Sequence, residues 1–326
     1  MKLLVKGMLC ASLIMSCVSA KDTVKVGPSD TAMRFDSVAD IEIFTSENAD
    51  GKITPKSIEE AFKKAGFKIS ANRDMNGPFV KQFKESGFDT YNLFTFYKQD
   101  TVLELVKKYQ NIGLFAPMSM AIYTKKGEKK ISVSSLTAEA MAKIMKAPSD
   151  DKILHDLRKL IKDTLKEAMP NGKFETLNYE TQAPKDELVT NFSMEMDAVD
   201  WDDQLEDFKM IFEGELAANG FIIAGHNNLG DDFYEENYSA FDFYEVYSVC
   251  KLPVIYAIAK TRPEAGAFAP CSLYLSKKKD DTMMHIGFPS VYNWMSSMAI
   301  DNKEDMEVLE SAQAGIKKIL KGLTKY

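Results

Sequence analysis

The chain has 326 residues, of which 45% are hydrophobic and 27% charged, a balance typical of globular proteins with room for two domains. Its formal net charge of -7 argues against a general electrostatic attraction to nucleic acid or to an anionic membrane. Arginine, the usual phosphate-binding residue, occurs only at Arg34, Arg73, Arg158 and Arg262. We therefore expect no nucleic-acid partner.

Residues 1–20 have the features of a secretory signal peptide. Lys2 and Lys6 give a basic start, and the apolar stretch at 8–15 is too short to span a bilayer. Small residues precede a cleavage position after Ala20. The sequence thus predicts a protein exported to a bacterial periplasm.

The same segment allows a second processing route. Residues 14–17 resemble a lipoprotein cleavage box in which Cys17 would be acylated, although Met15 fits that box poorly. We favour soluble export and keep a lipoprotein anchored at Cys17 as the alternative. Later runs of apolar residues are too short for a transmembrane helix, so no further span is expected.

The first half of the mature chain alternates between strand and helix patterns. Thr54 and Pro55 can begin a helix and Gly66 can end it, because these residue types favour the first and last turns. The expected elements are strands at 41–44, 67–69, 91–97, 118–123 and 130–134, and helices at 54–66, 102–106 and 153–165.

The second half repeats this order after a turn-rich segment at 170–185, which we expect to be a linker. The expected elements are strands at 192–196, 221–223, 241–250, 272–276 and 283–287, and helices at 204–219, 255–259 and 309–323.

A duplicated motif shows why the order recurs. Residues 113–119 read Gly-Leu-Phe-Ala-Pro-Met-Ser, and residues 266–272, which lie 153 positions later, read Gly-Ala-Phe-Ala-Pro-Cys-Ser. We therefore predict a first repeat domain at 38–169 and a second at 186–323. Each should be an α+β domain with a mainly antiparallel sheet and helices packed against it. Two matched domains can pack about a pseudo-twofold axis, so we expect a monomer.

The second repeat carries a strand that ends at Cys250, a helix led by Pro253, and a Pro270-Cys271 pair that opens the next strand. In these features the sequence resembles the family known as domain of unknown function 302 (DUF302), in tandem copies. The first repeat keeps the proline but has Tyr97 in the place of the first cysteine. The resemblance implies a small domain similar to the TATA-binding-protein-like fold and implies no established reaction.

The candidate ligand-binding residues are Cys250, Cys271, His226 and His285, which all lie in the second repeat. Thiolates and imidazoles suit a soft metal such as Cu(I). However, no paired metal-ligand spacing is present, and buried cysteines commonly act as small core residues. We therefore predict no cofactor and keep a soft metal as a possibility.

The two cysteines raise a further question in an oxidising compartment. If a parallel crossover joins their strands, Cys250 and Cys271 lie at opposite ends of the sheet, too far apart for a disulfide. A different strand order would permit the bond. In the same parallel arrangement the start of the Pro253 helix would lower the pKa of Cys250.

Acidic residues cluster at Asp231, Asp232, Glu235 and Glu236. Paired carboxylates can serve acid–base catalysis or bind a hard cation, but such a run is more typical of a solvated turn. No nucleophile elbow, phosphate-binding loop or dinucleotide fingerprint is present.

These observations favour a non-enzymatic, exported binding or interaction protein of two domains. Its partner would be a small molecule or another envelope protein. The alternative is a thiol- or metal-dependent periplasmic redox protein that uses the second repeat.

Overall fold

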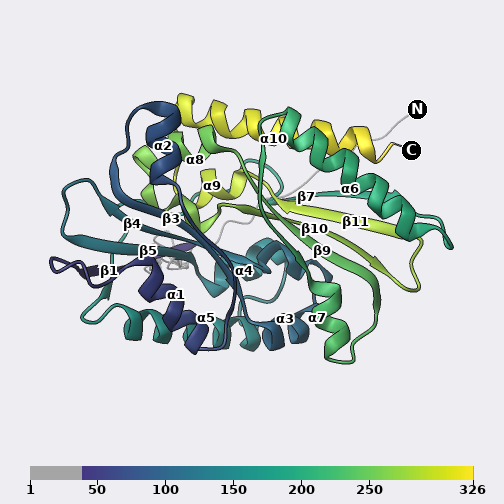
Figure 1. Ribbon diagram of the computed structural model, residues 1–326, viewed down its shortest axis with the longest axis horizontal. Coiled ribbons are helices and arrows are strands. Elements are labelled where there is room, and N and C mark those ends of the chain that lie inside the picture. The colour runs from purple at the N-terminus through teal and green to yellow at the C-terminus, as the bar shows by residue number, and fades with distance from the viewer. Residues whose placement is uncertain (1–38, 326) are drawn as a thin grey trace, which may run out of the picture. The chain divides into compact units, whose positions relative to one another are not determined.

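The computed structural model describes residues 39–325, which form one compact unit. The expected signal peptide and its expected cleavage position lie outside the described residues. Within them, each repeat builds one antiparallel sheet with helices packed against it, so the α+β prediction is confirmed (Figure 1).

The first repeat contains five main strands, one short strand and their connecting helices. In chain order these are β1 (Ile41–Glu47), α1 (Pro55–Lys64), β2 (Lys68–Asp74), α2 (Asn76–Phe83), β3 (Phe88–Tyr97), α3 (Gln99–Val106), the 3-10 turn η1 (Gln110–Phe115), β4 (Met118–Lys125), β5 (Lys130–Leu136), α4 (Ala138–Met145), α5 (Lys152–Ala168) and β6 (Lys173–Phe174).

The second repeat follows the same plan. Its elements are β7 (Val189–Glu195), α6 (Trp201–Ala218), β8 (Ile222–Asn228), α7 (Leu229–Glu235), β9 (Phe241–Cys250), α8 (Leu252–Thr261), the 3-10 turn η2 (Pro263–Ala267), β10 (Cys271–Lys278), β11 (Met283–Pro289), α9 (Tyr292–Ser297) and α10 (Lys303–Leu323).

The two sheets have the same topology. The first has the strand order β2-β3-β4-β5-β1-β6 and the second β8-β9-β10-β11-β7. All of the strand pairs are antiparallel, including β9 with β10. This arrangement corrects the parallel crossover considered for the two cysteines.

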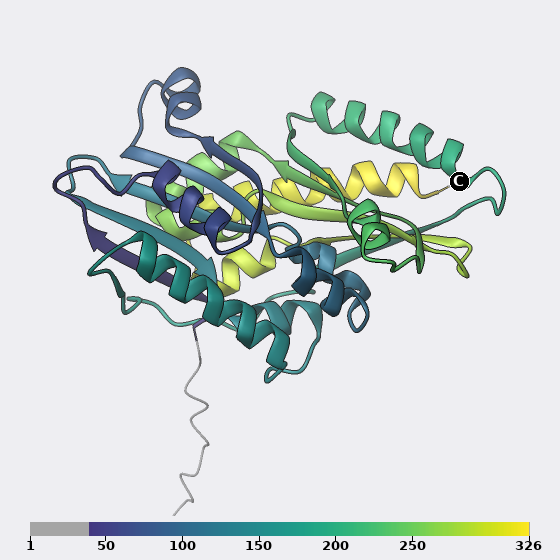
Figure 2. The same ribbon diagram turned by 60° about the horizontal axis from the view of Figure 1, so that its bottom comes forward.

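Each sheet carries its own long helices. Helices α1 and α5 pack together on the first sheet, and α6 and α10 lie side by side on the second (Figure 2). Apolar side chains spaced along α6, such as Phe208, Phe212 and Leu216, are buried against the second sheet. This is the amphipathic pattern of a helix that covers one face of a sheet.

The repeats interlock through η1 and η2, each of which contacts the sheet of the other repeat. The Gly113 amide donates to the Tyr244 hydroxyl at 2.8 Å, and that hydroxyl donates to the Gln110 carbonyl at 2.6 Å. In the matching contact, the Tyr91 hydroxyl donates to the Pro263 carbonyl at 2.9 Å. Tyr91 and Tyr244 occupy equivalent positions, so the interface has pseudo-twofold symmetry.

The duplicated motif forms the centre of this interface. Ser119 donates to the Pro270 carbonyl at 2.9 Å, and Ser272 donates to the Pro117 carbonyl at 2.8 Å. Both motif prolines follow a cis peptide bond. The motif recurs because each copy contacts the other repeat.

Two features differ from the sequence-based expectation. Helices α2, α4, α7 and α9 occur where no helix was expected. The segment expected as a linker, 170–185, also contacts both repeats: β6 pairs with β1, and Tyr179 donates a hydrogen bond to Glu264 at 2.7 Å. No helix within residues 39–325 is long and apolar enough to cross a membrane, as expected.

Candidate functional site

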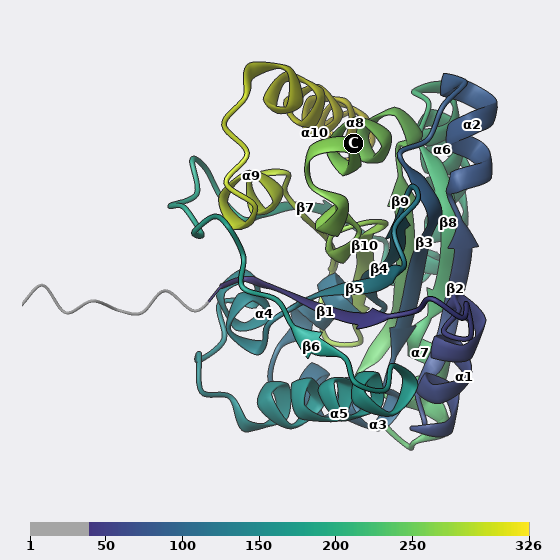
Figure 3. The same ribbon diagram turned by 90° about the vertical axis from the view of Figure 1, so that its left-hand side faces the viewer.

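The edge strands β2 and β8 run beside each other (Figure 3). Residues of both strands line a cleft. Two side chains bridge these strands: Arg73 Nε donates to the Ala224 carbonyl at 3.0 Å, and Ser70 donates to Asn227 at 3.0 Å. We call this volume of about 470 Å³ the open cleft. Its walls are residues 71–75, Pro78, Leu93 and Thr95 of the first repeat, and residues 222–224, Cys250, Leu252 and Pro270 of the second.

The open cleft has the composition of a small-molecule site. Its volume falls within the range of ligand pockets, and its walls are mainly apolar with a few polar groups. Thr95 is 1% exposed, and its hydroxyl has no hydrogen-bond partner among the described residues. A buried hydroxyl without a partner is costly, so a ligand that supplies one would bind favourably.

Cys250 ends β9 and forms part of the cleft wall. It is 9% exposed, and burial raises the pKa of its thiol to about 12, with a further contribution from the neighbouring Cys271. The amide of Lys251, at the start of α8, acts in the opposite direction but is the weakest of the three effects. The expected lowering of the Cys250 pKa is therefore wrong, because desolvation disfavours the thiolate.

Cys271 begins β10 and pairs with Val249, the residue before Cys250. The two cysteines thus lie at the same end of neighbouring antiparallel strands, and both are free thiols. They share the wall of a small apolar cavity of about 60 Å³. Although part of Cys271 is exposed, its sulfur lies among apolar side chains, and burial raises the pKa of this thiol to about 12.

The two histidines lie elsewhere on the second sheet. His226 Nε2 is 2.7 Å from Glu245 Oε2, and it lies four positions along β8 from Ile222, which pairs with Cys250. Burial acts to raise the pKa of Glu245, but His226 and Lys209 outweigh it and lower this pKa.

His285 is on β11, where its Nε2 is 2.9 Å from Asp281 Oδ2. The structure therefore brings Cys250 and Cys271 together and separates them from both histidines. Within residues 39–325, no group of three or more His, Cys, Asp or Glu side chains is placed to hold a metal ion. A soft-metal site thus stays a prediction, and it would need ligands beyond the two thiols.

Three residues of the acidic cluster, Asp231, Asp232 and Glu235, lie in α7, and Glu236 follows it in a turn. Asp232 is 13% exposed and accepts hydrogen bonds from Lys68 and Tyr97, both at 2.7 Å. Gln99 also donates to its backbone carbonyl at 3.3 Å. The expectation of a solvated acidic turn is therefore wrong for Asp232, which joins the two repeats.

These contacts lie at the pseudo-twofold equivalent of the open cleft, which we call the closed cleft. Tyr97 stands opposite Lys68 on β3 and β2, as Cys250 stands opposite Ile222 on β9 and β8. Asp232 is the equivalent of Pro78, because the same shift of 154 positions relates Lys68 to Ile222 and Phe79 to Phe233. The closed cleft thus holds Lys68 and Tyr97, both bonded to Asp232. The open cleft has an isoleucine, a cysteine and a proline at the three equivalent positions.

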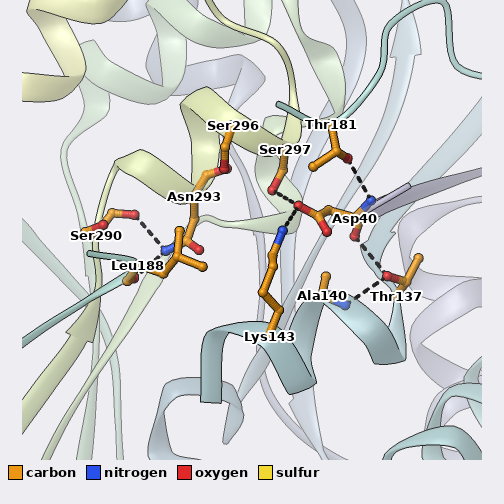
Figure 4. A network of polar contacts seen from close by, with 10 residues as sticks. All are labelled: Asp40, Thr137, Ala140, Lys143, Thr181, Leu188, Ser290, Asn293, Ser296 and Ser297. Atoms are coloured by element: carbon orange, nitrogen blue, oxygen red, sulfur yellow. Dashed lines mark hydrogen bonds and ion pairs between the residues drawn. The ribbon is translucent and has the colours of Figure 1, made fainter. Parts of the chain in front are cut away.

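A second polar cluster joins the repeats at a different place (Figure 4). The carboxylate of Asp40 accepts hydrogen bonds from Lys143 of α4 and, at 2.6 Å, from Ser297 of α9. Asp40 and Ser297 are 4% and 1% exposed. Because both are buried and bonded to each other, we assign this cluster to holding α4 and α9 together rather than to binding a ligand.

Comparison with known proteins supports the duplication. The model of a family described as domain of unknown function DUF302 matches residues 44–168 and again residues 198–323. A solved structure titled "Crystal structure of uncharacterized conserved protein DUF302 from Bacillus stearothermophilus" is 14% identical. The match covers 42% of this chain and 98% of that chain, with a TM-score of 0.35. No curated protein matches the chain.

Proposed function

We propose, for a chain that belongs to the DUF302 family and carries that domain twice, a non-enzymatic role in binding a small molecule in the open cleft. The main support for this proposal is the difference between the two equivalent clefts. Asp232 bridges to Tyr97 and Lys68 in one, whereas about 470 Å³ is left between the matching residues of the other. Volume, apolar walls and an unpaired buried hydroxyl all suit a ligand.

Binding is a better interpretation than catalysis because the cleft lacks a poised acid–base pair. Asp74, the carboxylate in its wall, accepts hydrogen bonds from the amides of Asn76 and Gly77, both at 3.0 Å. The Cys250 thiol is protonated at neutral pH because burial raises its pKa to about 12. A protonated thiol is a poor nucleophile.

We also propose a periplasmic location with cleavage after Ala20, and a monomeric state. Both rest on the sequence: the basic, apolar and small-residue pattern of residues 1–20, and the second copy of the domain, which supplies a partner within the same chain. Intact-mass analysis of the native protein would show a chain starting at Lys21, whereas a lipid on Cys17 would contradict soluble export.

The experiment for the binding site introduces the three polar residues of the closed cleft at the equivalent positions of the open cleft. The variant Cys250→Tyr/Ile222→Lys/Pro78→Asp should lose binding of the neutral apolar probe N-phenyl-1-naphthylamine by tenfold or more. Its tyrosine, lysine and aspartate would occupy the space as their equivalents do in the closed cleft. Probe fluorescence in titrations measures this, with circular dichroism to verify folding. Ile222→Lys alone, at a position 50% exposed, is a milder second test.

The matched control removes apolar surface elsewhere. Val199 and Met210 are 80% and 68% exposed, so Val199→Lys/Met210→Lys should leave probe binding unchanged. Loss of binding in this control variant together with full binding in the folded cleft variant would place the probe on the surface near α6 and contradict the proposal.

A thiol-dependent redox role is the second candidate, and the neighbouring strand positions of Cys250 and Cys271 favour it. We expect neither thiol to react with a maleimide at pH 7 in the folded protein and both to react after unfolding in guanidinium, because burial raises both pKa values to about 12. Rapid labelling of the folded protein would favour the redox role. Thiols that react only after reduction would show a disulfide.

A further inference from the structure

The guanidinium of Arg73 lies at the open cleft, and some of its N–H donors have no partner among the described residues. Its Nε donates to the Ala224 carbonyl across the cleft, and this is the one hydrogen bond of its side chain among the described residues. The two other described arginines are engaged: Arg158 pairs with Glu42, and Arg262 stacks on Tyr179 and donates to the Met298 carbonyl. The terminal nitrogens of Arg73 therefore remain available at the cleft.

The adjacent acid does not occupy these donors. Asp74 has each of its oxygens on a backbone amide of the first turn of α2, and no ion pair joins it to Arg73 in the described structure. At the equivalent position of the closed cleft stands Asn227, which is neutral and bonds to Ser70. The arginine is thus particular to the open cleft, because the cation of the closed cleft, Lys68, is paired with Asp232.

The rest of the cleft is suited to an apolar body. Met75, Leu93, Ile223 and Leu252 supply its walls, with the protonated Cys250 thiol among them. A single guanidinium presents two parallel N–H donors, the geometry that fits one carboxylate. A phosphate group generally requires more positive charge than this cleft contains.

We infer that the open cleft binds a small apolar molecule that ends in a carboxylate, with Arg73 holding the carboxylate and the apolar part lying against the walls. This inference rests on the proposed function and adds the ligand class. The volume suits a chain of roughly ten carbon atoms, as expected for pockets of this size. The unpaired hydroxyl of Thr95 offers a second polar contact inside the cleft.

The test compares decanoate with its neutral analogue decanol as competitors of N-phenyl-1-naphthylamine. In the unmodified protein, decanoate should compete at least tenfold better than decanol. Arg73→Gln should weaken the binding of decanoate by about tenfold, the lower end for a hydrogen bond between charged groups, because the Arg73 side chain is exposed. The same variant should weaken the binding of decanol and of the neutral probe far less than that of decanoate, and Arg73→Lys should recover part of the loss.

The control removes one exposed cation elsewhere. The side chain of Lys52 is 83% exposed, and Lys52→Gln should change the binding of neither competitor. Equal competition by decanoate and decanol, unchanged in Arg73→Gln, would overturn the inference. If the variant Cys250→Tyr/Ile222→Lys/Pro78→Asp still abolished probe binding, the proposed function would stand without the inferred carboxylate ligand. Probe binding that persists in that folded variant would overturn both.

Discussion

Gly113→Ala is expected to destabilise the protein by about 3 kcal/mol, the upper end for overpacking a filled interior. A Cβ atom at Gly113 would lie 2.5 Å from Tyr274 Cβ and 2.9 Å from the Tyr244 ring. Those side chains belong to the other repeat, and the Tyr244 hydroxyl also accepts a hydrogen bond from the Gly113 amide. The methyl group would therefore push η1 away from the second sheet and lengthen this hydrogen bond. Urea unfolding followed by circular dichroism measures the loss.

The chain supplies a matched control and a symmetric repeat of this experiment. Gly214 lies inside α6, and a Cβ atom added there would have no neighbour within 4 Å, so Gly214→Ala should stabilise by about 0.5–1 kcal/mol through helix propensity. Gly266→Ala should behave like Gly113→Ala, because its Cβ would lie 2.6 Å from Ala121 Cβ. A neutral effect at both interface glycines would show that the repeats do not pack as described.

The sequence revealed the duplication but not what the repeated motif does. The match between residues 113–119 and 266–272 predicted two similar domains, and the structure confirms two sheets of the same topology. A pattern of identical residues does not say which surface they contact. The glycine and serine of each copy are needed by the opposite repeat, and that reason becomes visible only when both copies are placed together.

Helices α2 and α7 were missed because they are short and contain poor helix formers, although Asn228 caps α7. They have eight and seven residues, and they contain Gly77 and Pro78 or Gly230, which are poor helix formers. Both are anchored by tertiary contacts of a buried phenylalanine, Phe79 or Phe233. Tertiary packing therefore outweighs local preference here, and it is these short helices that place Pro78 and Asp232 at the two clefts.

Part of the candidate site could be predicted and part could not. Comparing the repeats identified Cys250 as the counterpart of Tyr97, and Cys250 does form part of the open cleft. The histidines were grouped with it because their residue types suit metals, but residue type gives no distance. The missed residues, Arg73 and Thr95, lie in the first repeat, and a search confined to the second copy could not find a site built between the two.

Opening the closed cleft should create a second binding site. In Tyr97→Cys/Asp232→Ala, the tyrosine ring and the carboxylate that bridge the repeats are removed, and the space should resemble the open cleft with its Cys250 and Pro78. We expect two molecules of N-phenyl-1-naphthylamine to bind per chain instead of one. The loss of a buried aromatic ring should also cost about 3 kcal/mol of stability.

Stoichiometry, rather than affinity, is the informative measurement, and native mass spectrometry or calorimetry supplies it. Tyr97→Phe is the control, because it removes the hydrogen bond to Asp232 but leaves a ring in the cleft; it should still bind one probe molecule. Because Asp232→Ala also leaves the Lys68 ammonium without its partner, the stoichiometry is measured with the neutral probe and not with decanoate. A folded double variant that still binds one probe would mean that Tyr97 and Asp232 do not close an equivalent site, and the reason for assigning binding to the open cleft would be lost.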